Sequence, residues 1–311
     1  MSTAQNILGQ LSGALEAQLA DAGDITVAVR NSAHQHVSGM LWQPDVVVTS
    51  EQSVGGRDEY EVVTARGEAT KARIVGRDPG TNLLVLKPDT ALPMQPTAAG
   101  SAAGTARTGA FALALGADVA GASTARFGIV HSVGPQWVSR AGGRLEQRIA
   151  LDIRLARTEE GGPVLDAGGA LLGMSTLGVR GEVLVIPRAT IERIVPQLVQ
   201  HGRVPRGWLG LALQPVAVPD ALRDAAGQRS GMMVMSIVAG SPGAEADIHA
   251  GDILLTIDGA SMRQGRHLAA MLDADSIGRR RELRLIRGGE VLKVEVSIAA
   301  RPPEGSQPPK S

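Results

Sequence analysis

Short apolar segments separated by turn-forming residues run through the chain from Asp24 onward, and this pattern constrains the fold most strongly. Turns such as Gln43-Pro44-Asp45, Arg66-Gly67 and Asp78-Pro79-Gly80 separate the first segments. The predicted strands of this first set are Ile25–Arg30, Val37–Trp42, Val46–Thr49, Tyr60–Ala65, Ala72–Val75 and Leu83–Leu86. Six strands in about sixty residues predict one closed antiparallel barrel.

A second set of strands follows a looser Ala/Gly/Thr stretch at Ala98–Thr108. Its predicted members are Ala110–Leu115, Thr124–Val133, Leu145–Asp152, Val164–Leu165, Ala170–Ser175 and Val183–Ile186. Glycine supplies 39 of 311 residues, against roughly 7 % in average proteins, which suits many short strands joined by tight turns. We therefore predict a mostly β fold with two six-stranded barrels in series, the chymotrypsin-like architecture.

Two segments have helical spacing instead. Residues 4–22 carry apolar side chains at Ile7, Leu11 and Leu15 with polar residues between them, which predicts an N-terminal amphipathic helix that packs on the body or on a partner. Gly23 is its expected end. Thr190–Gln200 is predicted to be helical for the same reason.

The stretch from Leu151 to Thr176 carries the most specific motif, and its centre is Thr158-Glu159-Glu160-Gly161-Gly162-Pro163. It resembles the segment around the nucleophilic serine of trypsin-like proteases of the HtrA (DegP-like) type. In that family T-D-A…G-N-S-G-G-P-L precedes a D-G turn and G-I-N-T. The ungapped match pairs Asp152 with the aspartate, Gly161-Gly162-Pro163 with G-G-P, and Gly173 and Thr176 with the outer residues of G-I-N-T. The serine position is Glu160.

The same resemblance locates the other two triad positions. The histidine segment, L-T-N-N-H-V in the family, matches Val48–Ser53 and puts Gln52 at the base position. The aspartate segment, G-R-D-P-x-T-D-L-A-V-L, matches Gly76–Leu86 and puts Asn82 at the aspartate position. All three positions are thus replaced.

These replacements change the chemistry that is expected of the cleft. A serine protease needs a hydroxyl, an imidazole to take its proton and a carboxylate to orient the imidazole. Gln52 cannot shuttle a proton near neutral pH, and Asn82 carries no charge to stabilise an imidazolium. Glu160 is a poor nucleophile toward an amide. We therefore expect no catalytic residue, hence a pseudoprotease.

The oxyanion-hole-like loop, Thr158 to Gly161, leaves other possibilities open. The Glu160 carboxylate could plug the site by accepting the backbone N–H groups of Thr158 and Glu160, because that spot favours negative charge. Glu51, Glu159 and Glu160 are candidates for a carboxylate pair around one water, although nothing in their spacing forces that geometry. A solvated loop is the plain alternative.

Residues 207–301 resemble a PDZ domain of the HtrA kind, with its G-S-P-A and G-D-[IL]-I…I-D-G pattern matched by Gly240-Ser241-Pro242-Gly243-Ala244 and Gly251–Gly259. Such a groove adds an extended peptide as a strand and holds its terminal carboxylate on loop N–H groups. The residue pattern of this segment predicts a strand at Trp208–Val216, a helix at Gln264–Leu272 and a hairpin turned at Gly288-Gly289. The expected peptide-binding residues are Trp208, Leu209, Gly210, Leu211, His267, Leu268 and Met271. Leu268 and Met271 are alternatively core residues.

Bulk properties exclude several partners. Lys+Arg 31 balance Asp+Glu 31, so no nucleic acid or anionic membrane is expected as a partner, and the run Arg279-Arg280-Arg281 is interpreted as a solvated turn. With no Cys, the chain has no disulfide, thiol nucleophile or thiolate metal site. His34 and His36 are a weak metal pair without a third ligand, so no metal and no cofactor are expected. The N-terminus has no secretory or membrane-spanning pattern, which favours a cytoplasmic location, with the periplasm as the alternative if a leader is removed.

The predicted organisation has five parts: residues 1–23 as the N-terminal helix, 24–202 as the protease-fold domain, 203–207 as a linker, 208–301 as the PDZ domain and 302–311 as a disordered tail. The first hypothesis is an inactive bacterial HtrA-like protein that binds peptide or protein C-termini, chaperone-like or regulatory, through its PDZ groove and vestigial cleft. The alternatives are an active quality-control endopeptidase with an unorthodox site and an adaptor for a partner such as an active protease. Family members are commonly trimers, but the helix lacks the aromatic residues that such trimers use.

Overall fold

The computed structural model describes residues 3–32, 35–57, 59–94, 104–262, 268 and 271–302. The contacts between residues divide the chain into two compact units, Met1–Val204 and Pro205–Ser311. Each unit is described by itself.

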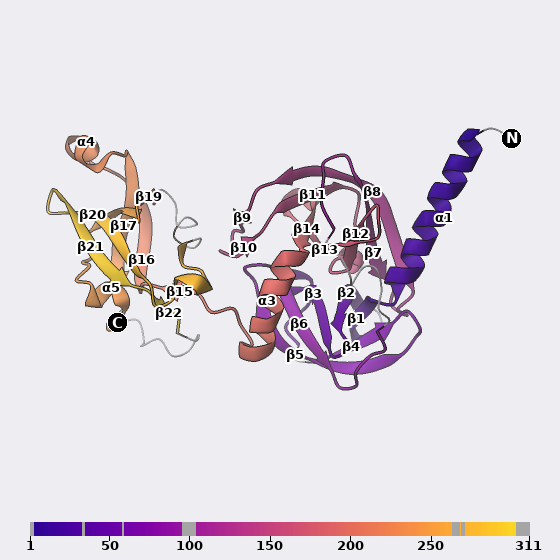
Figure 1. Ribbon diagram of the computed structural model, residues 1–311. Coiled ribbons are helices and arrows are strands. Elements are labelled where there is room, and N and C mark those ends of the chain that lie inside the picture. The colour runs from indigo at the N-terminus through magenta and orange to yellow at the C-terminus, as the bar shows by residue number, and fades with distance from the viewer. Residues whose placement is uncertain are drawn as a thin grey trace. The chain divides into compact units, whose positions relative to one another are not determined.

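The N-terminal helix α1, Thr3–Gly23, confirms the helical prediction, but only its C-terminal half is packed. Leu15, Leu19 and Ala22 join the main core of the first unit. Ile7 and Leu8 are 60 % and 69 % exposed, and Figure 1 shows this end of α1 leading away from the barrels. The apolar stripe therefore packs on the body over part of its length only.

The first barrel forms as predicted, with slightly longer strands. Its members are β1 (Thr26–Ser32), β2 (Gln35–Gln43), β3 (Val46–Ser50), β4 (Glu59–Thr64), β5 (Ala69–Asp78) and β6 (Leu83–Pro88). They close in the order β1-β2-β3-β6-β5-β4, and the short 3₁₀ turn η1, Glu51–Ser53, follows β3. The end of β3 and the start of β6 therefore lie side by side, because Ser50 pairs with Leu83.

The second barrel closes in the order β11-β14-β13-β12-β7-β8. Its strands are β7 (Phe111–Ala117), β8 (Ser123–Gly134), β11 (Arg148–Asp152), β12 (Pro163–Asp166), β13 (Leu171–Leu177) and β14 (Val183–Pro187). The prediction of one strand over Leu145–Asp152 is wrong at its N-terminal end, because β11 begins only at Arg148. Leu145 belongs instead to β10 (Arg144–Leu145), which pairs with β9 (Trp137–Val138) in a separate small sheet. The 3₁₀ turn η2, Arg157–Glu159, precedes β12, and η3, Val179–Gly181, links β13 to β14.

The main core of the first unit draws on both barrels. Met40 and Leu83 come from the first barrel, Leu115 and Met174 from the second, and all are in one buried cluster. Helix α3, Arg188–His201, adds Ile191, Ile194, Val195 and Leu198 to that cluster. The barrels are thus joined by a shared apolar core, which fixes the cleft between them.

The second unit is built on a sheet in the order β16-β17-β18-β20-β21, with β19 beside β18 (Figure 1). Its elements are β15 (Gly207–Trp208), β16 (Leu211–Ala217), η4 (Asp220–Leu222), α4 (Arg223–Ala226), β17 (Ser230–Ile237), α5 (Pro242–Glu245), β18 (Ile253–Ile257), β19 (Ala260–Ser261), η5 (Ala274–Ser276), β20 (Arg280–Arg287), β21 (Glu290–Ser297) and β22 (Ala299–Ala300). The hairpin at Gly288-Gly289 is confirmed. The predicted strand Trp208–Val216 is instead broken at Leu209-Gly210. Most of the predicted helix Gln264–Leu272 lies outside the described residues, as does most of the tail.

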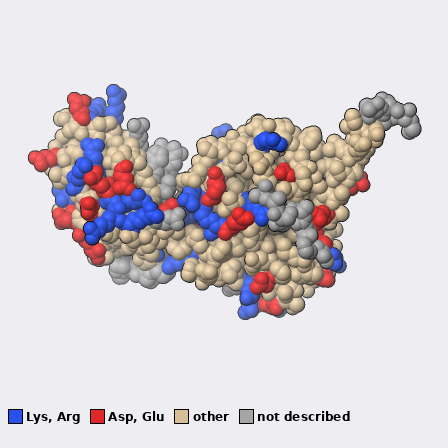
Figure 2. Space-filling view, viewed as in Figure 1, with Lys and Arg blue, Asp and Glu red and all other residues tan. Residues whose placement is uncertain are grey.

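Charges of both signs are interspersed over the visible face of the second unit (Figure 2). The arginine run is not a turn, because Arg280 and Arg281 begin strand β20 and Arg281 pairs with Asp258 at 2.6 Å. Among the described residues, no helix is both long and apolar enough to cross a membrane.

Candidate functional site

Three residues from separate parts of the sequence meet in the cleft between the barrels: Gln52 in η1, Asn82 just before β6 and Glu160 just after η2. The main-chain N–H of Gln52 donates to Oδ1 of Asn82 at 2.8 Å. The side-chain Nε2 of Gln52 donates to Oε1 of Glu160 at 2.5 Å. The fold therefore groups the three positions that the sequence motifs selected.

The Glu160 carboxylate is buried, with only 2 % of the residue exposed, and it accepts hydrogen bonds from five donors. Besides Gln52, the donors are Oγ of Ser50 at 2.9 Å, Oγ of Ser53 at 2.5 Å, Oγ1 of Thr176 at 2.7 Å and the N–H of Leu177 at 3.0 Å. No Lys or Arg of the described chain forms an ion pair with it. A buried carboxylate without a cation is tolerated only where such donors replace its hydration.

The plug hypothesis is wrong in its geometry. The carboxylate points toward η1 and β13, while the N–H of Glu160 donates to the carbonyl of Arg157 at 3.4 Å. The N–H groups of Glu159 and Gly161 also have internal acceptors, Ala156 and Ser175. Within the described residues, Thr158 alone in this loop has an N–H without an acceptor. The loop therefore does not offer the two converging donors that an oxyanion needs.

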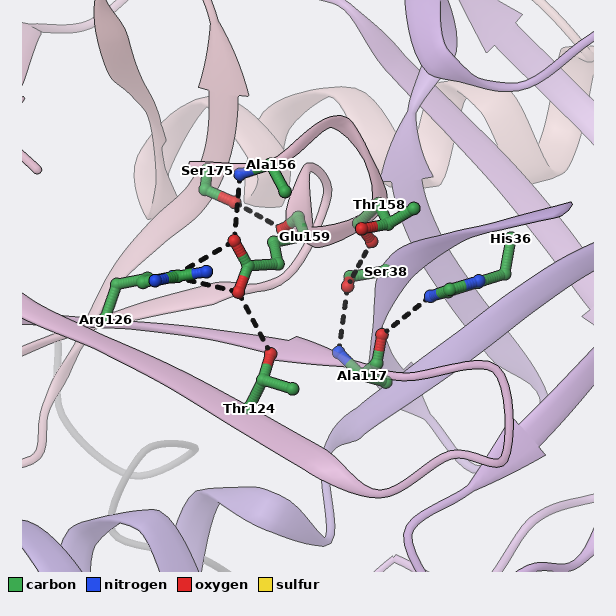
Figure 3. Close-up of polar contacts among 9 residues, drawn as sticks. All are labelled: His36, Ser38, Ala117, Thr124, Arg126, Ala156, Thr158, Glu159 and Ser175. Carbon is green, nitrogen blue, oxygen red and sulfur yellow. Dashed lines mark hydrogen bonds and ion pairs between the residues drawn. The ribbon is translucent and has the colours of Figure 1, made fainter. Parts of the chain in front are cut away.

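The neighbouring Glu159 fixes this loop through contacts of its own, and Figure 3 shows its carboxylate between Arg126, Thr124 and Ala156. Nε of Arg126 in β8 contacts both of its carboxylate oxygens, at 3.0 and 3.1 Å. The same carboxylate accepts the N–H of Ala156 at 2.8 Å, and Ser38 donates to the carbonyl of Thr158 at 2.8 Å. On sequence alone, Glu159 is a candidate for a carboxylate pair. In the structure Glu159 is buried, and its carboxylate holds the loop in place.

Asn82 completes the network, and its side chain, like that of Gln52, is a neutral amide. Its Nδ2 donates to Oγ of Ser50 at 2.9 Å and to Oγ1 of Thr176 at 2.7 Å. Nε2 of Gln52 also contacts the carbonyl of Leu177 at 2.8 Å. The side-chain amides are thus used as donors to neighbours, and an amide neither takes nor gives a proton near pH 7. The arrangement can hold a structure rigidly but has no general base of the imidazole kind.

Sequence reasoning missed the roles of Ser50, Ser53, Thr176 and Leu177. Ser50 and Ser53 lie close to Gln52 in the sequence, and Thr176 is the last residue of the matched motif. The sequence therefore shows that they are near the candidate site, but it does not show their hydrogen bonds. Two cavities adjoin the group. One, of about 360 Å³, is lined by residues that include Tyr60, Gln52 and Arg157, and the other, of about 230 Å³, by residues that include Trp137, Leu177 and Gly178.

The other candidate groups do not converge. Glu51 lies 3.8 Å from Arg77, so Glu51, Glu159 and Glu160 each have their own partners and form no carboxylate pair. A ring nitrogen of His36, Nε2, lies 3.1 Å from the carbonyl of Ala117, and His34 is outside the described residues. No group of three or more metal-ligating side chains occurs in the described part of the chain.

In the second unit, the loop between β15 and β16 carries the predicted peptide-binding residues. Leu209 is buried in the core of this unit, and Leu211 and partly exposed Trp208 flank the loop. Gly210 has a φ of +74°, and a Cβ added there would lie 2.1 Å from Cβ of Ser241. In the described part of the unit, the N–H groups of Leu209 and Gly210 donate to no acceptor. The chain thus presents two neighbouring free donors at a loop where only glycine fits.

The facing helix is described only in part. Leu268 and Met271 pack against the core that contains Leu209, so both contribute to the core as the alternative interpretation expected. His267 lies outside the described residues. A role for these three side chains in peptide contact stays a prediction.

Comparison with known proteins agrees with both units. Residues 37–174 match the trypsin-like peptidase domain family, and residues 207–298 match the PDZ domain family. A solved structure described as the HtrA-type protease AlgW with tripeptide is 25 % identical, with a TM-score of 0.70 over 94 % of this chain and 99 % of that one. The chain belongs to the HtrA-like family. The serine endoprotease from Yersinia pestis shares the fold, with a TM-score of 0.70 and 22 % identity over 93 % of this chain and 98 % of that one.

Curated HtrA-like relatives extend the match in sequence. The probable periplasmic serine endoprotease DegP-like of Brucella suis biovar 1 is 30 % identical over 272 residues, which is 85 % of this chain and 52 % of the relative. The protein of the same name from Pseudomonas savastanoi pv. phaseolicola is 28 % identical over 282 residues, 87 % and 57 % respectively. The chain therefore spans about half the length of the curated relatives it matches.

Proposed function

We propose that this HtrA-like chain does not cleave peptide bonds and instead binds peptide or protein C-termini through its PDZ unit. The environment of the Glu160 side chain supports the first part of this proposal, that the chain does not cleave peptide bonds. Its carboxylate occupies the serine position, is buried, and is held by five donors, while Gln52 stands at the position of the base. In serine proteases the loss of the triad costs about a million-fold in kcat.

The test of inactivity compares three proteins in a fluorescent casein assay. The unmodified chain and a Glu160→Ala variant are expected to show the same background. The triple variant Gln52→His, Asn82→Asp, Glu160→Ser rebuilds the residue types that the family pattern requires and measures whether the cleft could cut at all. Cleavage by the unmodified chain that disappears in Glu160→Ala would contradict the proposal.

A second candidate is an endopeptidase with an unorthodox site, and two observations favour it. The relatives are named serine endoproteases, and the Ser53 hydroxyl donates to Oε2 of Glu160 at 2.5 Å beside the larger cavity. In that mechanism Oγ of Ser53 would attack the peptide carbonyl carbon and pass its proton to Glu160. The amine would leave with that proton, and water would hydrolyse the ester. Activity lost in Ser53→Ala, with folding retained, would favour this candidate.

The second half of the proposal rests on the free N–H groups of Leu209 and Gly210. Two such donors beside an edge strand suit the terminal carboxylate of a peptide that adds to the sheet along β16. We expect labelled peptides with an apolar last residue and a free carboxylate to bind with micromolar affinity. Amidation of the C-terminus should abolish binding, and equal affinity of both forms would contradict the carboxylate assignment.

A pair of glycine variants sharpens this test. Gly210→Ala should abolish peptide binding, because its Cβ would lie 2.1 Å from Cβ of Ser241 and must displace the loop. Gly227→Ala is the matched control, since Gly227 also has a positive φ, +70°, but has open space around its Cβ position. The control should bind as the unmodified chain does. Identical binding by both variants would show that the loop is not the site.

For the cellular setting we propose the periplasm, because the relatives are named periplasmic proteins. This replaces the cytoplasmic expectation drawn from the N-terminal sequence. There the chain would bind clients in a chaperone-like way or regulate an active protease. Cell fractionation with an antibody tests the location, and recovery with cytoplasmic markers only would contradict it.

A further inference from the structure

Gln52, Asn82 and Glu160 form hydrogen bonds to further residues as well as to one another, and many of these hydrogen bonds join the two barrels. Ser50, Gln52, Ser53 and Asn82 belong to the first barrel and its turns, whereas Glu160, Thr176 and Leu177 belong to the second. Each hydrogen bond from Ser50, Gln52 or Ser53 to Glu160 therefore crosses the cleft. The bonds of Asn82 and Gln52 to Thr176 cross it as well, at 2.7 and 3.2 Å.

Leu177 ends β13 at a place where the strand has a free edge. On one side it pairs with Val183 of β14. On the other side β12 has already ended, since its register with β13 begins at Pro163 opposite Met174. A strand edge with an unpaired N–H and carbonyl is the usual place for an extended peptide to add.

In this chain that edge is already occupied by side chains. The N–H of Leu177 donates to Oε1 of Glu160 at 3.0 Å, and its carbonyl accepts from Nε2 of Gln52 at 2.8 Å. Glu160 and Gln52 thus imitate the acceptor and donor of an added strand. The 230 Å³ cavity lined by Trp137, Leu177 and Gly178 lies next to this edge.

We propose that Gln52 and Glu160 form an autoinhibitory clasp that locks the two barrels together and closes the Leu177 edge to extended peptides. An incoming main chain must displace both side chains to pair with Leu177. It would also leave the Glu160 carboxylate short of a donor in a buried site, which is costly. The peptide-binding role of the chain then falls to the PDZ unit, while the cleft stays shut in the resting protein.

Hydrogen exchange of the Leu177 amide in the full chain tests the clasp directly. Glu160→Ala removes the acceptor of that amide, so its exchange should become about tenfold faster or more. Gln52→Ala, at an exposed position, should accelerate it less, because it frees the carbonyl and not the N–H. Glu192→Ala is the matched control, since Glu192 is an exposed glutamate of α3 that pairs with Arg188 within the same helix. Unchanged Leu177 exchange in folded Glu160→Ala would overturn the proposal.

Peptide binding provides the second readout. It tests the clasp through Gln52→Ala even if Glu160→Ala fails to fold. The probe is an extended apolar peptide, acetylated and amidated, so that the carboxylate loop of the PDZ unit has nothing to hold. It should bind Gln52→Ala and folded Glu160→Ala but not the unmodified chain. Equal binding to the unmodified chain and to Gln52→Ala would overturn the clasp. The free-carboxylate peptide, measured in parallel, reports on the PDZ proposal alone, so the two failures are distinguishable.

Discussion

Two adjacent glutamates show how strongly the surroundings decide the role of a residue. Glu159 is buried against the guanidinium of Arg126, whereas Glu160 is buried among neutral donors only. Both carboxylates hold the same short loop, one to the β8 side of the second barrel and the other across the cleft. The loop is thus fixed by two anchors of different chemistry, and each can be tested separately.

At the residue scale, Arg126→Met should lower the free energy of unfolding of the first unit by about 1–3 kcal/mol. It removes charge-assisted hydrogen bonds and leaves a buried carboxylate with fewer partners. Arg73→Met is the control, because Arg73 is 71 % exposed and lies 3.5 Å from Asp89, a surface pair worth about 0–1 kcal/mol. Urea titrations with both variants measure the difference. Equal destabilisation would argue against the anchoring role of Glu159.

At the scale of elements, acidic side chains tie neighbouring segments together. Asp252, before β18, contacts Nε and an Nη of Arg287 in β20 at 2.9 and 2.7 Å. Burial alone would raise the pKa of Asp252, but the hydrogen bonds from Arg287 and from the N–H of His249 outweigh it, so its pKa is lowered. Burial alone would also raise the pKa of Glu146, but the hydrogen bonds from Arg193 and Thr190 of α3 outweigh it, so its pKa is lowered too.

These lowered pKa values predict acid sensitivity of both units. A carboxyl group whose pKa is lower in the folded chain stabilises the fold above its unfolded pKa, and this stabilisation is lost as pH falls through the folded value. The ordinary values are 3.8 for Asp252 and 4.5 for Glu146. The free energy of unfolding measured in urea should therefore decrease as the pH falls below about 4. For the second unit, Arg287→Met should make this decrease smaller. An Arg287→Met profile parallel to that of the unmodified chain would contradict this assignment.

The elements also show which features the sequence predicts and which it does not. The twelve barrel strands were predictable because turn residues and apolar alternation are local signals. The pair β9–β10 was not, because two-residue strands leave no periodicity, and the break at Leu209-Gly210 depends on the close approach of Ser241. At the site, motif matching found Gln52, Asn82 and Glu160. Their hydrogen bonds to Ser53 and Leu177 depend on how the two barrels close, which no local pattern contains.

At the scale of the whole molecule, the position of the cores predicts where the chain can be divided. The largest core cluster mixes Met40 and Leu83 of the first barrel with Leu115 and Met174 of the second. The core of the PDZ unit, which contains Leu209 and Leu254, is separate. A cut after Val204 should therefore give two fragments that fold independently. A cut after Thr108 would separate the two barrels, and neither barrel should then fold by itself.

Circular dichroism melts and the two peptide probes check this division. Fragment 205–311 should bind the free-carboxylate peptide within about twofold of the affinity of the full chain, because its loop and core are intact. Fragment 1–204 should retain slow exchange at Leu177, since every partner of Glu160 lies within it. Folded, separate fragments 1–108 and 109–204 would show that the shared core does not join the barrels. Fast Leu177 exchange in a folded fragment 1–204 would mean that the clasp needs the PDZ unit, which would make the cleft responsive to what that unit binds.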